Sequence, residues 1–328
     1  MSISNYIEEI DHLWQRQLTQ WDAVIKNYGN LTHVASRVVE LGDSSIALQY
    51  NPERLKSSSA NIDEASLKAR PCFLCSENQP LEQESVLWEN RYKIQVNPYP
   101  IFSRHLTISA VEHTPQRIAG RFVDMMLLAR NLEDYVVFYN GPQCGASAPD
   151  HMHFQAGLRK ELPICDELFA ASIRLFDANN KGIFGAVTSL GRPVFYIETM
   201  STALGEMWFD SLLNELPVKN GHVEPMVNVL CWHNNGSWCI AVFPRRKHRP
   251  ACYGTGEDQF VLSPASVDMG GLWAVAREED YKNLTLHDVT IIYMDVCQSP
   301  QVVDEISEKL LQYYYSKKTI DYGTSSAS

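Results

Sequence analysis

The sequence predicts an α+β protein of two tandem lobes, in each of which antiparallel strands are flanked by helices. Three observations support this fold class. Apolar residues recur at helical spacing near both ends of the chain, short β-rich runs fill the middle, and the second half repeats the order of strands and helix found in the first. At 328 residues and 45% hydrophobic composition, the chain can bury one large core or two medium ones.

The first half begins with a predicted amphipathic helix over residues 3–28. From about residue 31 the pattern changes, and short runs rich in β-branched and aromatic residues predict strands at 34–41, 44–50, 92–100, 105–111 and 135–141. The Ser- and Asn-containing segment 57–71 predicts a surface loop. A further helix is expected over 114–134, because Thr114 can cap it and the following Pro suits its first turn.

The second half repeats this arrangement in outline. It contains a predicted helix near 201–215, a last amphipathic helix over 300–315, and β-rich runs at 194–200, 226–234, 237–250 and 289–296. We therefore divide the chain into an N-terminal helix (1–30), a first lobe (31–175) that carries the chemical motifs, and a second lobe (176–328).

The composition of the chain restricts its location and partners. The first ten residues, MSISNYIEEI, lack the basic start and apolar run of a signal peptide, and no apolar stretch would span a membrane. We expect a cytoplasmic protein without a membrane partner. The formal net charge of −11 disfavours nucleic acid as a partner, because that affinity comes mainly from Lys and Arg. Eight cysteines with a single CxxC pair indicate thiols or a metal site in a reducing compartment.

The most informative segment is NGPQCGASAPDHMHFQ, which starts at Asn140 and predicts a strand, a tight loop and a second strand. In an extended chain, side chains two positions apart share a face, so His151, His153 and Gln155 would line one surface. Two imidazoles and a carboxamide are costly to bury without partners, which favours a functional role. The alternative is a pair of structural histidines that meet backbone carbonyls.

A second cluster favours a metal site. Cys72 and Cys75 have the spacing with which two thiolates bind zinc, and such a site needs two further ligands from elsewhere in the fold. His105 and His113, which flank a predicted strand, and His151 are the candidates.

Together, CFLC, HLTISAVEH and NG…GAS-x-P…HxHxQ resemble the histidine-triad superfamily in its transferase branch. That branch holds galactose-1-phosphate uridylyltransferase, diadenosine tetraphosphate phosphorylase and the GDP-hexose phosphorylases. The resemblance covers residues 45–160 and extends more weakly to the second half, through SPASVDMGGLWAV and FPRRKH. It implies two histidine-triad-like lobes, the second one degenerate, and nucleotidyl transfer through a covalent nucleotidyl-histidine intermediate.

The resemblance also implies roles for individual residues. His153 would attack the α-phosphorus, Gln155 would hydrogen-bond the phosphate oxygens, and Asn140 would bind substrate. Ser147 would lie in the loop that contacts the leaving phosphate. The ligands of a structural zinc ion would be Cys72, Cys75, His113 and His151.

The local sequence departs from the uridylyltransferases, which have prolines before and between the two histidines; HMHFQA is closer to the phosphorylase form. This favours a phosphorylase of a nucleotide sugar or dinucleotide polyphosphate over a hexose-1-phosphate uridylyltransferase. A neutral imidazole nucleophile splits the exchange into two in-line displacements. Because Gln155 cannot titrate, it favours an acceptor whose oxygens are already ionised, such as phosphate or a sugar phosphate.

The second half adds a basic segment that stands out in an acidic protein. Arg245, Arg246 and Lys247 are candidates for clamping substrate phosphates, and the alternative is a solvated basic turn. A function of another class also stays open, namely a catalytically inactive, zinc-stabilised nucleotide-binding protein. A nucleic-acid-binding zinc module is disfavoured by the net charge, and the sequence leaves a homodimer open.

Overall fold

The computed structural model describes residues 3–54 and 69–325, so most of the predicted loop over 57–71 lies outside the described residues. Its centre is a sheet made of β3 (Val86–Trp88), β4 (Tyr92–Val96), β5 (His105–Ala110), β6 (Tyr135–Asn140), β7 (His153–Leu158), β8 (Arg174–Asn179), β9 (Gly182–Val187), β10 (Val194–Thr199), β11 (Val227–Asn234) and β12 (Ser237–Pro244). The strand order is β3-β4-β5-β7-β6-β11-β12-β10-β9-β8, and all neighbours are antiparallel.

The sheet contains the same unit twice. In the first half, chain-order strands one to five lie in the order 1-2-3-5-4, and the second half has this order in reverse. Each unit inserts one helix after its third strand: α5 (Phe122–Asn131) follows β5, and α7 (Thr202–Glu215) follows β10. The units meet where β6 pairs with β11, so that Asn140 lies opposite Asn228. The predicted α+β fold of two tandem lobes is confirmed, and the lobes share one continuous sheet.

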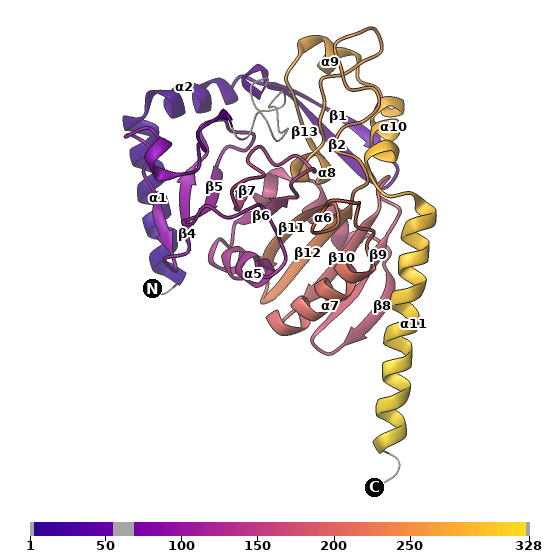
Figure 1. The fold of residues 1–328 in the computed structure, drawn as a ribbon. Coiled ribbons are helices and arrows are strands. Elements are labelled where there is room, and N and C mark those ends of the chain that lie inside the picture. The colour runs from indigo at the N-terminus through magenta and orange to yellow at the C-terminus, as the bar shows by residue number, and fades with distance from the viewer. Residues whose placement is uncertain (1–2, 55–68, 326–328) are drawn as a thin grey trace.

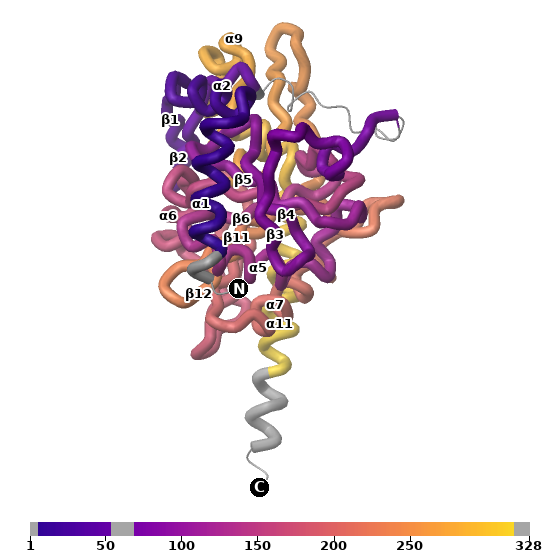
Figure 2. Tube along the Cα trace, turned by 90° about the vertical axis from the view of Figure 1, so that its left-hand side faces the viewer, coloured from indigo at the N-terminus to yellow at the C-terminus, as the bar shows by residue number. Residues whose placement is uncertain are grey.

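Helices and a small second sheet cover the two faces (Figure 1). One face packs against α1 (Ile3–Gln20), α5, α7 and α11 (Pro300–Ser325), and the other against α6 (Ile164–Ala170), α10 (Leu286–Val296) and a sheet of β1 (Ala35–Leu41), β2 (Ser44–Tyr50) and β13 (Leu272–Val275). Viewed from the N-terminal side, α1 runs beside the strands of the first half (Figure 2), whereas α11 packs on β8 at the other edge. The two terminal helices thus pack at opposite ends of the same sheet face.

The helix predicted over 3–28 is two helices, α1 and α2 (Asp22–Leu31). They are separated at Trp21, whose backbone is extended (φ −116°, ψ 102°). The change of direction carries α2 across the end of the sheet (Figure 1). There Asn27 Nδ2 donates to the carbonyl of Pro98 (2.6 Å), and the Tyr28 hydroxyl lies 3.1 Å from the carbonyl of His105.

The helix predicted over 114–134 begins only at Phe122. The preceding residues are not helical, because their backbone bonds to the loop before β7: the N–H of Met152 donates to the carbonyl of Thr114 (2.6 Å), and the N–H of Gln116 to that of Pro149 (3.1 Å). Gly120, at φ +73°, lies in the turn before the helix and adopts a backbone conformation that disfavours side chains. Because the segment before Phe122 is not helical, the side chain of Gln116 can reach the start of β7.

The run 289–296, grouped with the β-rich segments, lies within helix α10, so that prediction was wrong. A capping box starts this helix: the Thr285 side chain accepts from the Asp288 N–H (3.3 Å), and the Asp288 carboxylate accepts from the Thr285 N–H (2.8 Å). The β-branched content of the run suggested a strand. The Thr-x-x-Asp capping box four residues earlier instead favours a helix. Within the described ranges, no helix combines the length and apolar character needed to cross a membrane.

Candidate active site and metal centre

The predicted chemical residues gather at the end of the sheet where the two lobes meet. His153 opens β7 and is 3% exposed. The register that pairs Phe138 with Gln155 places Asn140 opposite His153, beyond the last ladder pair. The side chain of Gln116 bridges these two backbones. Its Oε1 accepts from the His153 N–H (2.8 Å), and its Nε2 donates to the carbonyls of His153 (3.0 Å) and Asn140 (2.9 Å).

Gln116 is a site residue that the sequence analysis missed. It lies in the segment predicted as the first turn of a helix, and its partners are distant in sequence. No pattern in the local sequence indicates that the side chain of Gln116 will hydrogen-bond to strand backbones, as a neighbouring strand would. The only available signal is the polar character of a residue between Pro115 and the apolar run that follows.

The tautomer of His153 follows from its neighbours. Its Nδ1 lies 2.8 Å from the carbonyl of His151, and because a carbonyl only accepts, Nδ1 carries the hydrogen and Nε2 keeps the lone pair. In the part of the chain that the structure describes, no group hydrogen-bonds Nε2. Burial lowers the pKa of His153 to about 4, although the hydrogen bond to His151 opposes this shift. The imidazole is therefore neutral near pH 7.

The polarity of the Gln155 side chain is fixed in a similar way. Its Oε1 lies 2.9 Å from Nε2 of His105 and accepts a longer bond from Asn97 Nδ2 (3.4 Å). Nδ1 of His105 accepts from the N–H of Ile101 (3.2 Å), so the hydrogen of this ring is on Nε2. The Gln155 oxygen is thus held by donors, which leaves its NH₂ group for an acceptor. His105, which the sequence offered as an alternative metal ligand, therefore donates to Gln155 and does not belong to the cysteine cluster.

Asn140 shows the same arrangement. Its Oδ1 accepts from the backbone N–H of Ser266 (2.8 Å) and from Nδ2 of Asn228 (2.9 Å), both of which belong to the second half. Its NH₂ group therefore faces away from these donors. Asn140 and Gln155 lie on the same face as His153, so two carboxamides offer hydrogen-bond donors beside the imidazole.

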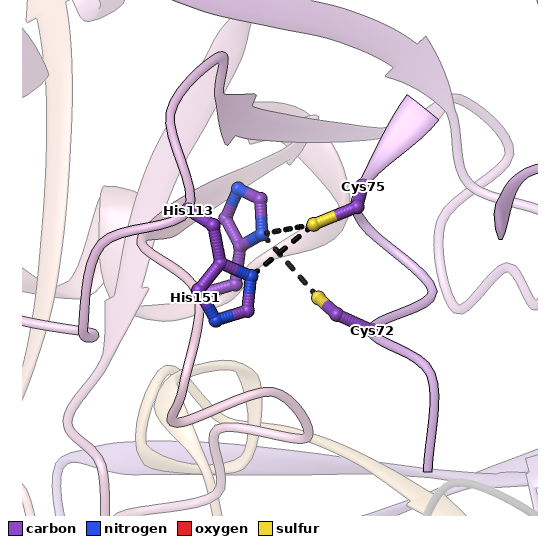
Figure 3. A group of neighbouring side chains, drawn as sticks. All are labelled: Cys72, Cys75, His113 and His151. Carbon is purple, nitrogen blue, oxygen red and sulfur yellow. Dashed lines mark hydrogen bonds between the residues drawn. The ribbon is translucent and has the colours of Figure 1, made fainter. Parts of the chain in front are cut away.

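Four side chains that could hold a metal ion converge next to the start of β7 (Figure 3). The ligand atoms of Cys72, Cys75, His113 and His151 all lie within 4.8 Å of one another. Nδ1 of His151 lies 3.3 Å from Sγ of Cys72 and 3.5 Å from Sγ of Cys75, and Nδ1 of His113 lies 3.2 Å from Sγ of Cys75. A tetrahedral ion with bonds of about 2.3 Å to sulfur and about 2.0 Å to nitrogen would have N···S edges of about 3.5 Å. The geometry fits such an ion.

The surroundings orient this cluster and connect it to His153. Nε2 of His151 donates to the carbonyl of Ala110 (2.8 Å), which turns the Nδ1 lone pair toward the cysteines. Buried Lys93 holds the segment between the cysteines, because its Nζ donates to the carbonyl of Leu74 (2.8 Å). The carbonyl of His151 in turn accepts from Nδ1 of His153, so His151 links the candidate metal ligands to His153.

Arg245 does not form the expected phosphate clamp, because the protein occupies its hydrogen-bonding capacity. The side chain is 1% exposed. A guanidinium has five N–H donors, and here they meet Oδ1 of Asn228 and the carbonyls of Val296, Pro264, Lys247 and His248. Arg245 lies behind Asn140, with Asn228 between them.

The remaining predicted residues lie around this centre. The side chains of Arg246 and Lys247 face α10, where both pair with Asp295, and the structure does not bring them to β7. Ser147 is half-buried in the loop between β6 and β7, and its carbonyl accepts from Nη2 of Arg70 (3.3 Å). Arg70 also pairs with Asp150 (3.0 Å), which ties this loop to the chain just before the first cysteine.

Comparison with known proteins supports the fold. A family model described as a domain of unknown function, DUF4922, matches residues 13–158. No curated protein matches the sequence. The crystal structure of yeast Ap4A phosphorylase Apa2 is similar, with 22% identity over 84% of this chain and 92% of that chain and a TM-score of 0.57. Its complex with Ap4A gives a TM-score of 0.59 at 19% identity, over 85% of this chain and 95% of that chain. The chain thus has the fold of this yeast enzyme.

Proposed function

We propose that this protein is a nucleotidyltransferase of the phosphorylase type, in which Nε2 of His153 bonds covalently to the α-phosphorus of a nucleotide. One observation supports this most directly: the His151 carbonyl holds the Nδ1 hydrogen of His153, so the Nε2 lone pair is presented beside the NH₂ groups of Asn140 and Gln155. Phosphate oxygens are acceptors, and the two carboxamides offer donors to them.

The reaction proceeds by two displacements. In the first, the Nε2 lone pair forms a bond to the α-phosphorus, and the bond to the bridging oxygen breaks, with its electron pair leaving on the departing phosphate. The imidazole keeps its Nδ1 hydrogen, and the His151 carbonyl stabilises the positive charge that develops on the ring. In the second, an acceptor oxygen attacks the phosphorus and the electron pair of the P–N bond returns to Nε2.

The substrate class follows from the acid–base chemistry of the site. Gln155 ends the HxHxQ motif, and because its side chain does not ionise, it cannot donate a proton to a leaving group. The leaving group must therefore be stable as an anion, which favours a nucleotide whose α-phosphate is linked to another phosphate. Because the yeast enzyme of similar fold is an Ap4A phosphorylase, we assign dinucleoside polyphosphates as the first substrate class and nucleotide sugars as the second, with inorganic phosphate as acceptor. Uridylyl transfer to a hexose phosphate uses the same displacements.

We also propose that the metal is zinc. Two thiolates and two imidazoles are its typical donors. The tetrahedral coordination sphere would be completed by Cys72, Cys75, His113 and His151. Four protein ligands would leave no open position, so the ion would supply rigidity and no Lewis-acid chemistry. The residues would thereby hold the His151 carbonyl at the position that orients His153.

The test is capture of the covalent intermediate. Wild-type protein is incubated with diadenosine tetraphosphate labelled at the α-phosphate, without phosphate, and then denatured. We expect protein-bound label that is labile to acid and stable to base, and that leaves when phosphate is added to the native complex. His153→Ala should retain neither label nor more than about 1% of the transfer rate, as expected for loss of a nucleophile. His12→Ala, at an exposed histidine, is the matched control. Label on His153→Ala, or none on wild type with any dinucleoside polyphosphate or UDP-, GDP- or ADP-sugar, would refute the proposal and leave the non-catalytic alternative.

A further inference from the structure

We infer that the second lobe contributes a positioning chain, Arg245–Asn228–Asn140, which fixes the polarity of a phosphate-binding carboxamide in the first lobe. The inference rests on the proposed function, because it assigns the NH₂ group of Asn140 to a substrate phosphate oxygen. It also gives the buried Arg245 a role in the reaction that involves no contact with substrate.

The first member of this positioning chain, the guanidinium of Arg245, can only donate hydrogen bonds. A guanidinium has no acceptor atom, so Asn228 must turn its Oδ1 toward Nη1 of Arg245. The NH₂ group of Asn228 then faces the opposite direction, toward Oδ1 of Asn140 (2.9 Å) and the carbonyl of Cys144 (2.7 Å). Asn228 is fully buried, so water cannot replace either contact at low cost.

Asn140 receives this polarity together with a second donor. The backbone N–H of Ser266 lies 2.8 Å from the same Oδ1, and a backbone N–H cannot accept. A flipped Asn140 would place its NH₂ group against both donors. Its carbonyl oxygen would then face the substrate phosphate, where acceptor would meet acceptor.

The first lobe cannot supply this restraint by itself. Its Gln116 holds the backbone carbonyl of Asn140 (2.9 Å), but among residues 3–54 and 69–325 every hydrogen bond to Oδ1 of Asn140 comes from the second half. The register explains this, because Asn228 is the cross-strand partner of Asn140 at the junction of the lobes. The active site of the first lobe is therefore complete only with the second lobe in place.

Asn228→Asp separates this role from a merely structural one. The carboxylate has the same shape and still accepts from Arg245, but it cannot donate to Asn140. We expect kcat for phosphorolysis of diadenosine tetraphosphate to fall about 10- to 100-fold, the effect of losing one hydrogen bond to a charged group, with a smaller change in KM. Asn234→Asp makes the same charge change at the other end of β11 and should leave the rate unchanged.

A double-mutant cycle decides whether Asn228 acts through Asn140. Asn140→Ala should lower kcat by a similar factor, and Asn228→Asp should add less than about threefold in the Asn140→Ala background. Melting temperatures of all variants exclude unfolding as the cause. Full additivity, or wild-type kcat for Asn228→Asp, would overturn the inference while the proposed function stands. A wild type that is not labelled on His153 would remove the proposed function and this inference together.

Discussion

Removal of the metal ion should lower the melting temperature of this protein by about 6 °C. The segment that carries the first two ligands has a small hydrophobic cluster, whose buried members among the described residues are Cys72, Leu74 and Ala148. The ion would tie this segment to His113 and to His151, which belong to two other parts of the chain. We therefore expect the metal to contribute much of what holds these three segments together.

The magnitude follows from binding linkage. An ion that binds only the folded state, at a free concentration 1,000 times its dissociation constant, stabilises that state by about 4.1 kcal/mol. Unfolding entropy is about 2.1 cal/mol/K per residue, so in a chain of 328 residues a change of 1 kcal/mol shifts the melting temperature by about 1.5 °C. The product of the two figures gives the shift of about 6 °C. If the metal-binding segment opens locally before the rest unfolds, the shift will be smaller and will appear as a separate early transition.

The assay is scanning calorimetry of the zinc-loaded protein, the chelated protein and the protein reloaded with zinc, with metal content measured by mass spectrometry. Cys75→Ser should reproduce the chelated state and bind less than one ion per chain. Cys252→Ser replaces a cysteine of similar exposure outside the cluster and should match wild type in both measurements. Equal melting of the loaded and chelated proteins, or one firmly bound ion in Cys75→Ser, would refute the structural role of this site.

Three further predictions concern single residues. Gln155→His places an ionisable group beside His153, so release of nucleoside monophosphate without acceptor should rise; unchanged release would count against the assigned role of Gln155. His105→Phe removes the donor that orients Gln155, and kcat should fall about 3- to 30-fold while the metal content stays at one ion; a lost ion would instead make His105 a ligand. Burial, with Arg249 and Arg245, lowers the pKa of His248 from 6.5 to about 4. Between pH 6.5 and about pH 4 the unfolded chain therefore binds more protons than the folded chain, and the free energy of unfolding falls as the pH drops through this range. His248→Gln should lose less stability than wild type between pH 7 and pH 4.5 in urea titrations; equal losses would contradict the shift.

Much of the central sheet could be predicted from local pattern. The β-rich runs around residues 92–96, 105–110 and 135–140 are strands because their residues are buried on both faces, which continuous apolar character signals well. The motif HxHxQ also indicated that His153 and Gln155 share a face. His151 differs, because it lies before β7 and its side chain turns to the cysteines.

The residues that the sequence did not reveal act across long separations. Gln116 bonds to a backbone 37 positions away, and Asn228 bonds to Asn140 88 positions away. Neither has a local signature, since a Gln in a loop and an Asn in a strand have many uses. Arg245 was visible as a basic residue in an acidic chain, but charge alone does not distinguish a surface clamp from a buried group whose donors meet carbonyls. Only the tertiary partners decide between these roles.

The two lobes use equivalent strands for different purposes, and the connections explain why. Between β6 and β7 lie residues 141–152, which include Ser147 and His151. Between β11 and β12 lie only Asn235 and Gly236, at φ 49° and 84°, a tight hairpin of the kind that joins twisted strands and has no length for such a loop. The second lobe therefore cannot build a site at the start of β12. The far end of β12 instead leads into Arg245, which lies behind Asn140 at the junction. If the proposed function holds, the second lobe has no loop for a site of its own but still restrains Asn140, so substitutions in the second lobe should affect catalysis in the first.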